Sequence, residues 1–324
     1  MRLRLVPQNT NYDFFRFRKI TMGASVVLMA ASILMWLTVG LNFGIDFKGG
    51  TSIRTEATQP VDSGAYRDAL APLGLGEVSV VEVSDPTFRA DQHVATITIQ
   101  AQEGEEAATD EMIRTIREAL EGVDATIELT SVDSVGPEIS GELIQTAVIA
   151  VLAALGAILF YIWLRFEWQF SVGAVAALFH DEILTIGIFS LLQIRFDLAT
   201  IAAILTIVGY SINDTVVIFD RLRENLRKFK KMPLQEVMNL SVNETLSRTL
   251  MTSGTTLLAL IALLIFGGDV IRGFVFAITW GVIVGTYSSV YVAKNVVLML
   301  GVKRDWSKPS DGGGAGTQFA NVDA

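Results

Sequence analysis

The sequence predicts an α-helical polytopic membrane protein with six transmembrane helices and one α+β domain outside the membrane. Hydrophobic residues make up 51% of the chain. They gather in runs long enough to cross a bilayer, which takes about 20 residues. A polar segment of about 100 residues, the usual size of a small domain, separates the first run from the others. These observations indicate a membrane protein with one sizeable extramembrane domain.

Six apolar runs reach this length. They are residues 20–40, 142–164, 168–192, 197–220, 248–267 and 272–293. The predicted domains are then an N-terminal segment (1–19), a first transmembrane helix (20–40), an extramembrane domain (41–141), a five-helix transmembrane domain (142–293) with a loop at 221–247, and a tail (294–324). The tail contains four glycines between 312 and 316, and we expect it to be partly disordered.

The distribution of Lys and Arg predicts the orientation, because basic flanks of membrane helices stay in the cytoplasm. Basic residues precede the first span, fill the loop 221–231 and recur at Lys303 and Arg304. With six spans, all three places lie on one side. Both termini are therefore expected in the cytoplasm, and the domain 41–141 in the periplasm of a bacterial cell. The first run has full span length and no small-residue cleavage pattern follows it, which predicts an uncleaved anchor.

The extramembrane domain is acidic, and its sequence predicts the element order βαββαβ. Residues 42–140 contain 19 Asp and Glu against 6 Lys and Arg, a net charge of −13. Strands are predicted near 50–57, 77–83, 94–101 and 124–132, and helices at 62–73 and 106–121. This order is typical of a ferredoxin-like domain. Its acidic run Glu103, Glu105 and Glu106 is interpreted as a solvated helix start, with a cation or polypeptide contact as the alternative.

An acid inside an apolar run is the most informative single residue. Asp214 lies in the span 197–220, and ionisable residues within a bilayer are costly and usually functional. Tyr210 and Ser211 share its helical face, and Gly209 and Asn213 adjoin it. Gly209 and Asn213 are also explained by helix packing. Packing does not require a carboxyl group, so Asp214 is predicted to handle protons.

A second polar stripe lies on the span 248–267. Arg248, Thr252 and Thr255 recur there at helical spacing. Burial would disfavour the charged form of Asp214 whereas a nearby Arg248 would favour it, so helix movement could load and release a proton. The alternative is that Arg248 only ends the basic loop.

The third span contains His180, Asp181 and Glu182 in sequence. Consecutive helical residues point about 100° apart, so the three cannot share one groove. At least one is expected to face the bundle and support the proton path. A structural hydrogen-bond network is the alternative.

Several segments together resemble the SecF family, the accessory membrane subunits of the bacterial Sec protein translocase. They are Phe43–Thr51 (with Gly44, Asp46, Gly49 and Gly50), Val135–Pro137, Gly209–Asp214, Phe219–Asn225 and Leu246–Ser253. From the residues alone, the glycines of the first segment are explained by turn chemistry. The resemblance runs from about residue 15 to 292.

The resemblance implies a six-span half of an RND-type fold that pairs with the homologous SecD and works with the Sec translocation channel. It implies use of the proton motive force in late steps of protein export across the inner membrane, with transient contact to the exported polypeptide. Proton passage is implied for Asp214 and Arg248. No catalytic residue, cofactor, metal ion or nucleic acid is implied.

Two features stand beside this resemblance. Lys294 occupies a position where the family leads us to expect a small residue or proline, and we expect it to extend to the cytoplasmic surface. Residues 222–245 alternate apolar and charged residues, which predicts an amphipathic helix on the membrane surface.

The residues leave other functions open. The chain has no Cys, and its two histidines, His93 and His180, have no ligand spacing, so disulfide and zinc chemistry are disfavoured. A proton-coupled exporter of small molecules is disfavoured because the RND-type fold normally has twelve spans. A non-conducting scaffold stays open. An intramembrane aspartyl protease would need Asp181 and Asp214 to face each other.

Overall fold

The computed structural model describes residues 10–101 and 109–302. It contains six helices that are long and apolar enough to cross a membrane, which confirms the six predicted spans. These helices are α1 (Arg18–Thr38), α5 (Pro137–Arg165), α6 (Trp168–Leu192), α7 (Leu198–Lys228), α8 (Leu234–Phe266) and α9 (Arg272–Ser288), which continues through a π-helical turn η2 (Ser289–Ala293) into α10 (Lys294–Leu300). The predicted acidic run at 103–106 and the tail beyond 302 lie outside the described residues.

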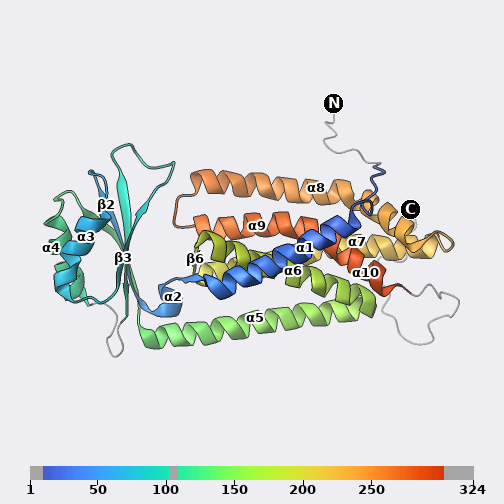
Figure 1. The fold of residues 1–324 in the computed structure, drawn as a ribbon, viewed down its shortest axis with the longest axis horizontal. Coiled ribbons are helices and arrows are strands. Elements are labelled where there is room, and N and C mark those ends of the chain that lie inside the picture. Colours follow the sequence, from blue (N-terminus) through green and yellow to red (C-terminus); the bar gives the residue numbers. More distant parts are fainter. Residues whose placement is uncertain (1–9, 102–108, 303–324) are drawn as a thin grey trace, which may run out of the picture.

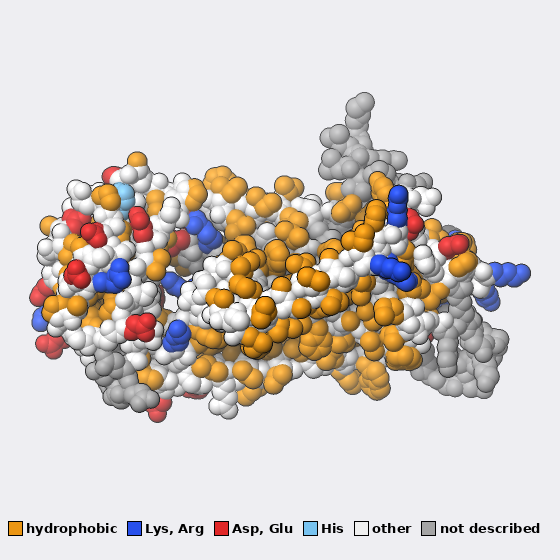
Figure 2. Space-filling model, viewed as in Figure 1, with side chains coloured by type: hydrophobic (Ala, Val, Ile, Leu, Met, Phe, Trp, Pro, Cys, Tyr) orange, Lys and Arg blue, Asp and Glu red, His pale blue; other side chains and the backbone are white. Residues whose placement is uncertain are grey.

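The membrane helices form one bundle whose surface is apolar. Figure 2 shows hydrophobic side chains over the length of the bundle, whereas charged side chains gather on the soluble domain and at the opposite end. Helices α6 and α9 lie inside the bundle and are the most buried, because α1, α7 and α8 pack around them. At Gly187 of α6 the backbone of α1 comes so close that a Cβ would lie 2.1 Å from the Ser32 side chain. Small residues thus allow close helix packing, as is common in membranes.

The soluble domain has the predicted βαββαβ order. Its elements are β2 (Gly50–Ala57), α3 (Ser63–Leu70) with a 3₁₀ turn η1 (Ala71–Leu73), β3 (Val78–Val83), β4 (His93–Gln100), α4 (Asp110–Glu121) and β5 (Glu128–Val135). The strands form an antiparallel sheet in the order β3-β4-β2-β5. The last strand begins four residues later than predicted, because residues 122–127 form the turn after α4.

One face of this sheet is the core of the domain. Ile53, Ile97, Ile116 and Leu120 are fully buried between the sheet and α3 and α4. Figure 1 shows these two helices on the side of the sheet away from the bundle. The other face of the sheet, which includes the hydroxyl side chains of Ser52, Ser79, Thr96 and Thr98, is therefore directed at the membrane helices.

A short segment connects α1 to the sheet. It contains β1 (Asn42–Phe43), which pairs in parallel with β6 (Arg195–Phe196) between α6 and α7, and the short helix α2 (Ile45–Lys48). Neither β1 nor β6 is predicted by the sequence, because two-residue strands leave no periodic pattern. The β1–β6 pair attaches the start of the soluble domain to the end of α6 and the start of α7.

Two ion pairs also join the soluble domain to the bundle. Arg54 of β2 pairs with Asp269 in the α8–α9 turn. Arg272 at the start of α9 pairs with Asp85 after β3 and donates to the Ser84 carbonyl oxygen at 3.0 Å. The domain therefore contacts the turn that links α8 to α9.

The predicted amphipathic surface helix at 222–245 is wrong. These residues extend α7 to Lys228 and begin α8 at Leu234. Leu222 and Leu226 pack in one core cluster with Val237 and Val242. The alternation of apolar and charged residues reflects two long helices that pack against each other at this end of the bundle.

The prediction that Lys294 extends to the surface is also wrong. Its side chain is fully buried, and its Nζ lies 4.1 Å from the ring centre of Phe15, 5.0 Å from Phe14 and 5.4 Å from Tyr291. The N-terminal segment folds back over α10 and covers the lysine. Cation–π attraction to three rings takes the place of water around the ammonium group.

Asparagines of α8 hold this N-terminal segment. The amide side chain of Asn243 accepts from the Tyr12 N–H at 2.8 Å and donates to the Tyr12 carbonyl oxygen at 2.9 Å. Asn239 accepts in the same way from the Phe14 N–H at 2.9 Å. The N-terminal segment, the α7–α8 turn and the end of α10 consequently lie together at the end of the bundle opposite the soluble domain (Figure 1).

Candidate proton-handling site in the bundle

The Asp214 carboxyl group is buried between α7 and α8. The residue is 3% exposed, and its Oδ2 atom has no hydrogen-bond partner among the described residues. The groups that act on it electrostatically come from α8, namely the Arg248 guanidinium and the Ser253 hydroxyl. No ion pair within the distance of a salt bridge joins Asp214 to Arg248 in the described part of the chain. The acid is thus enclosed but incompletely paired.

Hydroxyl groups of three helices surround this acid. Tyr210 of α7 donates to Ser253 Oγ of α8 at 3.4 Å, and Ser253 Oγ lies 2.7 Å from Thr286 Oγ1 of α9. These three residues with Asp214 form the cluster that we call the Asp214 centre. Ser253 and Thr286 are the members that were not singled out from the sequence. Thr286 gives no sequence signal beyond a hydroxyl residue inside an apolar run, whereas Ser253 also ends the family-like segment Leu246–Ser253.

Four other residues that the sequence analysis grouped with Asp214 or Arg248 do not join the Asp214 centre. Thr252 donates to the carbonyl oxygens of Arg248 and Thr249 in its own helix, so its hydroxyl is already satisfied. Arg248 is exposed at the edge of the bundle and Asn213 is exposed on α7. Gly209 is also exposed, and a Cβ built there would meet nothing within 4 Å. The close helix packing considered for Gly209 is therefore absent within the described chain.

Asp181 of α6 forms a second buried centre with residues of α7 and α9. Its Oδ2 atom accepts from Ser211 of α7 at 2.6 Å and from Ser288 of α9 at 2.7 Å, and its Oδ1 lies 2.9 Å from His180 Nδ1. Asp181 and His180 are both fully buried, and the His180 ring stacks on Tyr287 at 5.9 Å. His180 and Asp181 of the 180–182 cluster thus face the interior of the bundle, and their support of a proton path stays a prediction.

Glu182 and Ser211 lie outside the Asp214 centre. Glu182 is half-buried, and its Oε1 atom lacks a hydrogen-bond partner among the described residues. Ser211, expected on one face with Asp214, instead binds Asp181. Ser211 and Asp214 are three positions apart, which separates them by only about 60° around α7, yet Ser211 donates to Asp181 of α6 while Asp214 is directed at α8.

The two aspartates do not face each other. Asp181 is held by Ser211, Ser288 and His180, whereas Asp214 is directed at α8, and no interaction between the two carboxyl groups is present in the described residues. An aspartyl protease requires two acids that share a site. This geometry removes the argument for that alternative.

The glycine-rich segment after α1 shapes the junction between bundle and sheet. Asp46 accepts from the Leu198 N–H at 3.0 Å and so helps Asp197 to cap α7. Gly49 and Gly50 have φ values of 70° and 125°, and a Cβ on Gly50 would lie 2.2 Å from the Ile99 carbonyl oxygen. Gly44 packs on the stem of Arg195. Gly49 and Gly50 therefore adopt backbone conformations that favour glycine, as turn chemistry predicts.

Comparison with known proteins places these features in a family. The profile described as Protein export membrane protein SecD/SecF, C-terminal, matches residues 115–303, and the SecD/SecF GG motif matches residues 35–61. The second match covers the segment that contains Gly44, Gly49 and Gly50. The first covers all the spans after α1.

Relatives match along the full chain. The Protein translocase subunit SecF of Cereibacter sphaeroides is 64% identical over 100% of this chain and 99% of its own length. That of Rhodobacter capsulatus is 62% identical over 96% of each chain.

A solved structure has the same fold. The crystal structure of SecDF from Thermus thermophilus, described as a translocon-associated membrane protein, superimposes with a TM-score of 0.78 at 37% identity over 93% of this chain. The chain spans about 40% of that longer SecDF chain. The bundle, the motifs and the relatives agree: the chain belongs to the SecD/SecF family of protein export membrane proteins, among the protein translocase subunits named SecF.

Proposed function

We propose that this chain is a proton-coupled accessory subunit of the Sec protein translocase. It acts with a SecD-type half and uses the proton motive force to promote late steps of export across the bacterial inner membrane. The observation that carries the proposal is the Asp214 carboxyl group, buried in a membrane helix with one oxygen unpaired and with Arg248 on the neighbouring helix. Family membership supports the translocase context.

The chemistry of the Asp214 centre suits reversible protonation. A neutral carboxyl group tolerates its apolar surroundings, whereas an ionised one needs a cation or hydrogen-bond donors. Arg248 and Ser253 stand on α8, so a shift of α8 against α7 would change how well they stabilise the charged form. Each charge that moves down a membrane potential supplies about 2.3 kcal/mol per 100 mV. That is enough to bias a two-state arrangement of helices.

The Asp181 centre plays a supporting role in this proposal. Every oxygen of Asp181 already has a donor, so its carboxylate is suited to fixing α6, α7 and α9 relative to one another. Thr286 and Ser288 lie on the same helix, α9, two residues apart. The Asp181 centre thereby sets the position of one wall of the Asp214 centre.

A SecD-type half is the proposed partner at the exposed face of α7 and α8. This face carries Gly209, Asn213 and Arg248, and the amide and the guanidinium are costly to leave against lipid. A small residue and an amide are typical of interfaces between membrane helices. The SecDF chain, of which this chain spans about 40%, is more than twice as long and supports the need for a second half. Contacts with the Sec channel and with the exported polypeptide are part of the proposal.

The proposed topology places both termini in the cytoplasm. The described N-terminal segment and the end of α10 lie at one end of the bundle, and the soluble domain lies at the other. The basic loop 221–231 belongs to the first end, which supports its cytoplasmic location. We assign the domain at the opposite end, with its sheet order β3-β4-β2-β5, to a ferredoxin-like domain in the periplasm.

Proton flux tests the proposal. The chain and its SecD-type partner are reconstituted in vesicles with a trapped pH-sensitive dye, and flux is measured after a pH jump. Asp214→Asn, which keeps the shape but cannot ionise, is expected to reduce flux to the background of empty vesicles. Asp220→Asn is the matched control on α7, because Asp220 pairs with Arg165 outside the Asp214 centre. Equal flux in wild type and Asp214→Asn would favour the scaffold alternative.

A further inference from the structure

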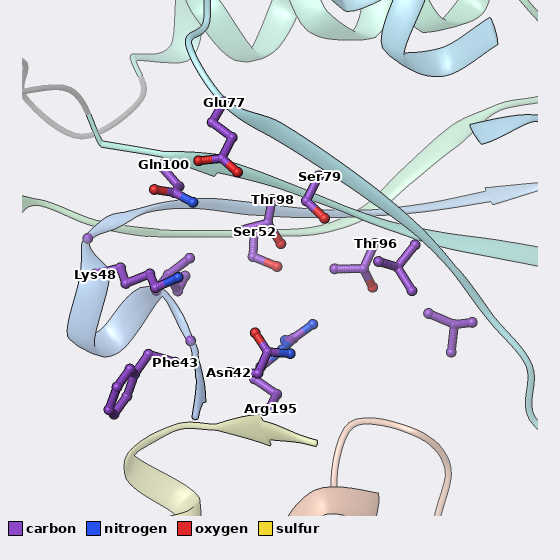
Figure 3. Close-up of a pocket in the computed structure, with 15 residues that line it drawn as sticks. Asn42, Phe43, Lys48, Ser52, Glu77, Ser79, Thr96, Thr98, Gln100 and Arg195 are labelled. Carbon is purple, nitrogen blue, oxygen red and sulfur yellow. The ribbon is translucent and has the colours of Figure 1, made fainter. Parts of the chain in front are cut away.

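A cavity of about 430 Å³ lies between the sheet and the membrane helices. Its upper wall is the hydroxyl-bearing face of β2, β3 and β4, which includes Ser52, Ser79 and Thr98. Its lower wall comes from α2 and β6. Figure 3 shows the sheet side chains on one side of the space and Lys48 and Arg195 on the other. The proton-handling site uses none of these residues.

The charge of this cavity is unbalanced. Lys48 and Arg195 are both exposed, and neither forms an ion pair with any described residue. Glu77 is the single carboxylate that lines the cavity in the described chain. Elsewhere at this junction the cations are paired, as Arg54 is with Asp269 and Arg272 with Asp85. Two unpaired cations in one polar cavity indicate an anionic ligand.

The cavity lies where the bilayer surface is expected. Helix α1 ends at Thr38, α6 ends at Leu192 and α7 begins at Leu198, and all three ends are within a few residues of β1 and β6. Phe43 packs edge-on against Phe196 at 5.8 Å just below. The ends of membrane helices meet the polar headgroup region at the bilayer surface. Phospholipid phosphates occupy the same level.

We propose that this cavity binds a phosphate-bearing anion, through Lys48 and Arg195 with hydrogen bonds from the sheet hydroxyls. A phospholipid headgroup of the adjacent leaflet and a free phosphate ester share this chemistry. Arg binds phosphate through a planar fork and Lys as a point charge. A bound headgroup would fasten the sheet to the membrane.

A unique cysteine in the cavity reports binding, because the chain has no Cys of its own. Val81 lines the cavity and is 57% exposed, so Val81→Cys can carry an environment-sensitive dye. The labelled full chain, with its SecD-type partner in a phosphate-free nonionic detergent, is titrated with dihexanoyl phosphatidylglycerol, glycerol 3-phosphate and inorganic phosphate. Dihexanoylglycerol, which lacks phosphate, is the negative probe.

The expected result is a saturable fluorescence change with phosphate-bearing probes only. The double variant Lys48→Gln with Arg195→Gln should raise the half-saturating concentration at least about tenfold, the loss of two charged contacts worth about 1.4 kcal/mol or more. Glu77→Gln should lower it, because the one opposing charge is removed. Arg114→Gln, an exposed position on α4, is the control and should change nothing.

The three phosphate-bearing probes also distinguish a lipid headgroup from a free phosphate ester as the ligand. Binding of phosphatidylglycerol alone assigns the cavity to a lipid headgroup, and equal binding of glycerol 3-phosphate or inorganic phosphate assigns it to a free phosphate ester. The proposal is overturned if dihexanoylglycerol binds equally, if only an unfolded polypeptide changes the signal, or if both charge variants titrate like wild type. Glu77→Gln keeps the test decisive where the double variant misfolds. None of these binding results depends on whether Asp214 conducts protons, so this test is separate from the proton-flux measurement.

Discussion

The two buried aspartates of this bundle differ in how completely they are paired. Asp181 receives three donors from three residues, whereas Asp214 keeps a buried oxygen without a partner among the described residues. A carboxylate held by several donors rigidifies its surroundings. An under-paired one is cheap to protonate. The contrast assigns a structural role to the first and the proposed proton role to the second.

This contrast predicts opposite effects of substitution on stability. Asp181→Leu keeps the branched shape of the side chain but leaves the buried Ser211 hydroxyl without its acceptor and limits Ser288 to the Gly285 carbonyl oxygen. We expect the free energy of unfolding to fall by about 1–3 kcal/mol. Asp214→Asn should lower the free energy of unfolding by less, because fewer hydrogen bonds are lost. Thermal unfolding of the purified complex in detergent measures both, and a larger loss for Asp214→Asn would contradict the assignment.

At the residue scale, sequence reasoning succeeds where the residue type alone carries the cost. Asp214 stands out because a carboxyl group in an apolar run needs an explanation. Lys294 does not, because the rings of Phe14 and Phe15 come from a segment about 280 positions away in the chain. Ser253 and Thr286 are likewise hidden, since a hydroxyl in a membrane helix often bonds only to its own backbone.

The α8–α9 turn is the element that connects the Asp214 centre to the soluble domain. Helix α8 carries Arg248 and Ser253, and the turn after it carries Asp269, which pairs with Arg54 of the sheet. Arg272, which opens α9, pairs with Asp85. Movement of α8 and α9 would therefore be transmitted to β2 and to the loop after β3.

The Asp85 pair has a defined dependence on pH. Burial alone would raise the pKa of Asp85, but hydrogen bonds from Thr87 and the cations Arg272 and Arg54 outweigh it, so the pKa lies below the ordinary value of 3.8. A lowered folded-state pKa gives a stabilisation that is present above the ordinary value and lost as the pH falls through the lowered one. The pair should therefore stay intact between pH 7 and pH 5.

Hydrogen exchange of the loop after β3 checks this prediction. Asp85→Asn should speed exchange there at both pH 7 and pH 5, after correction for intrinsic rates, while the wild type stays protected at both. Asp91→Asn is the control, because Asp91 lies in the same loop and its nearest cation, Arg89, is exposed. Loss of wild-type protection between pH 7 and pH 5, absent in Asp85→Asn, would contradict the account.

At the scale of elements, hydropathy predicts the six spans and alternation predicts the order of strands and helices. The errors fall where two elements create each other's surroundings. Residues 222–245 look amphipathic because α7 and α8 bury one face against each other, and β1 and β6 are strands only because each is beside the other. Contacts distant in sequence have no local pattern.

The whole molecule presents an unmatched polar face on an otherwise apolar bundle. Gly209 and Asn213 are exposed on α7 beside the exposed Arg248 of α8. Lipid would leave the Asn213 amide and the Arg248 guanidinium without hydrogen-bond partners. The account therefore requires another protein surface here, which the proposed SecD-type half supplies.

Filling this face should block assembly without unfolding the chain. Gly209→Leu meets nothing within 4 Å inside the protein, so we expect a normally folded chain that co-purifies with much less SecD-type partner. Gly156→Leu on α5 is the matched control, because a Cβ there also meets open space. Normal co-purification of Gly209→Leu would place the partner elsewhere.

The central claim is that protonation of Asp214 couples the proton gradient to export. Export of a secretory precursor is measured in vesicles that contain the translocase, this chain and its SecD-type partner, with and without an imposed proton gradient. Asp214→Asn is compared with wild type after equal assembly has been shown. The account predicts that the gradient accelerates export in wild type alone. Equal acceleration in Asp214→Asn would contradict it and leave the chain without a proton role at this residue.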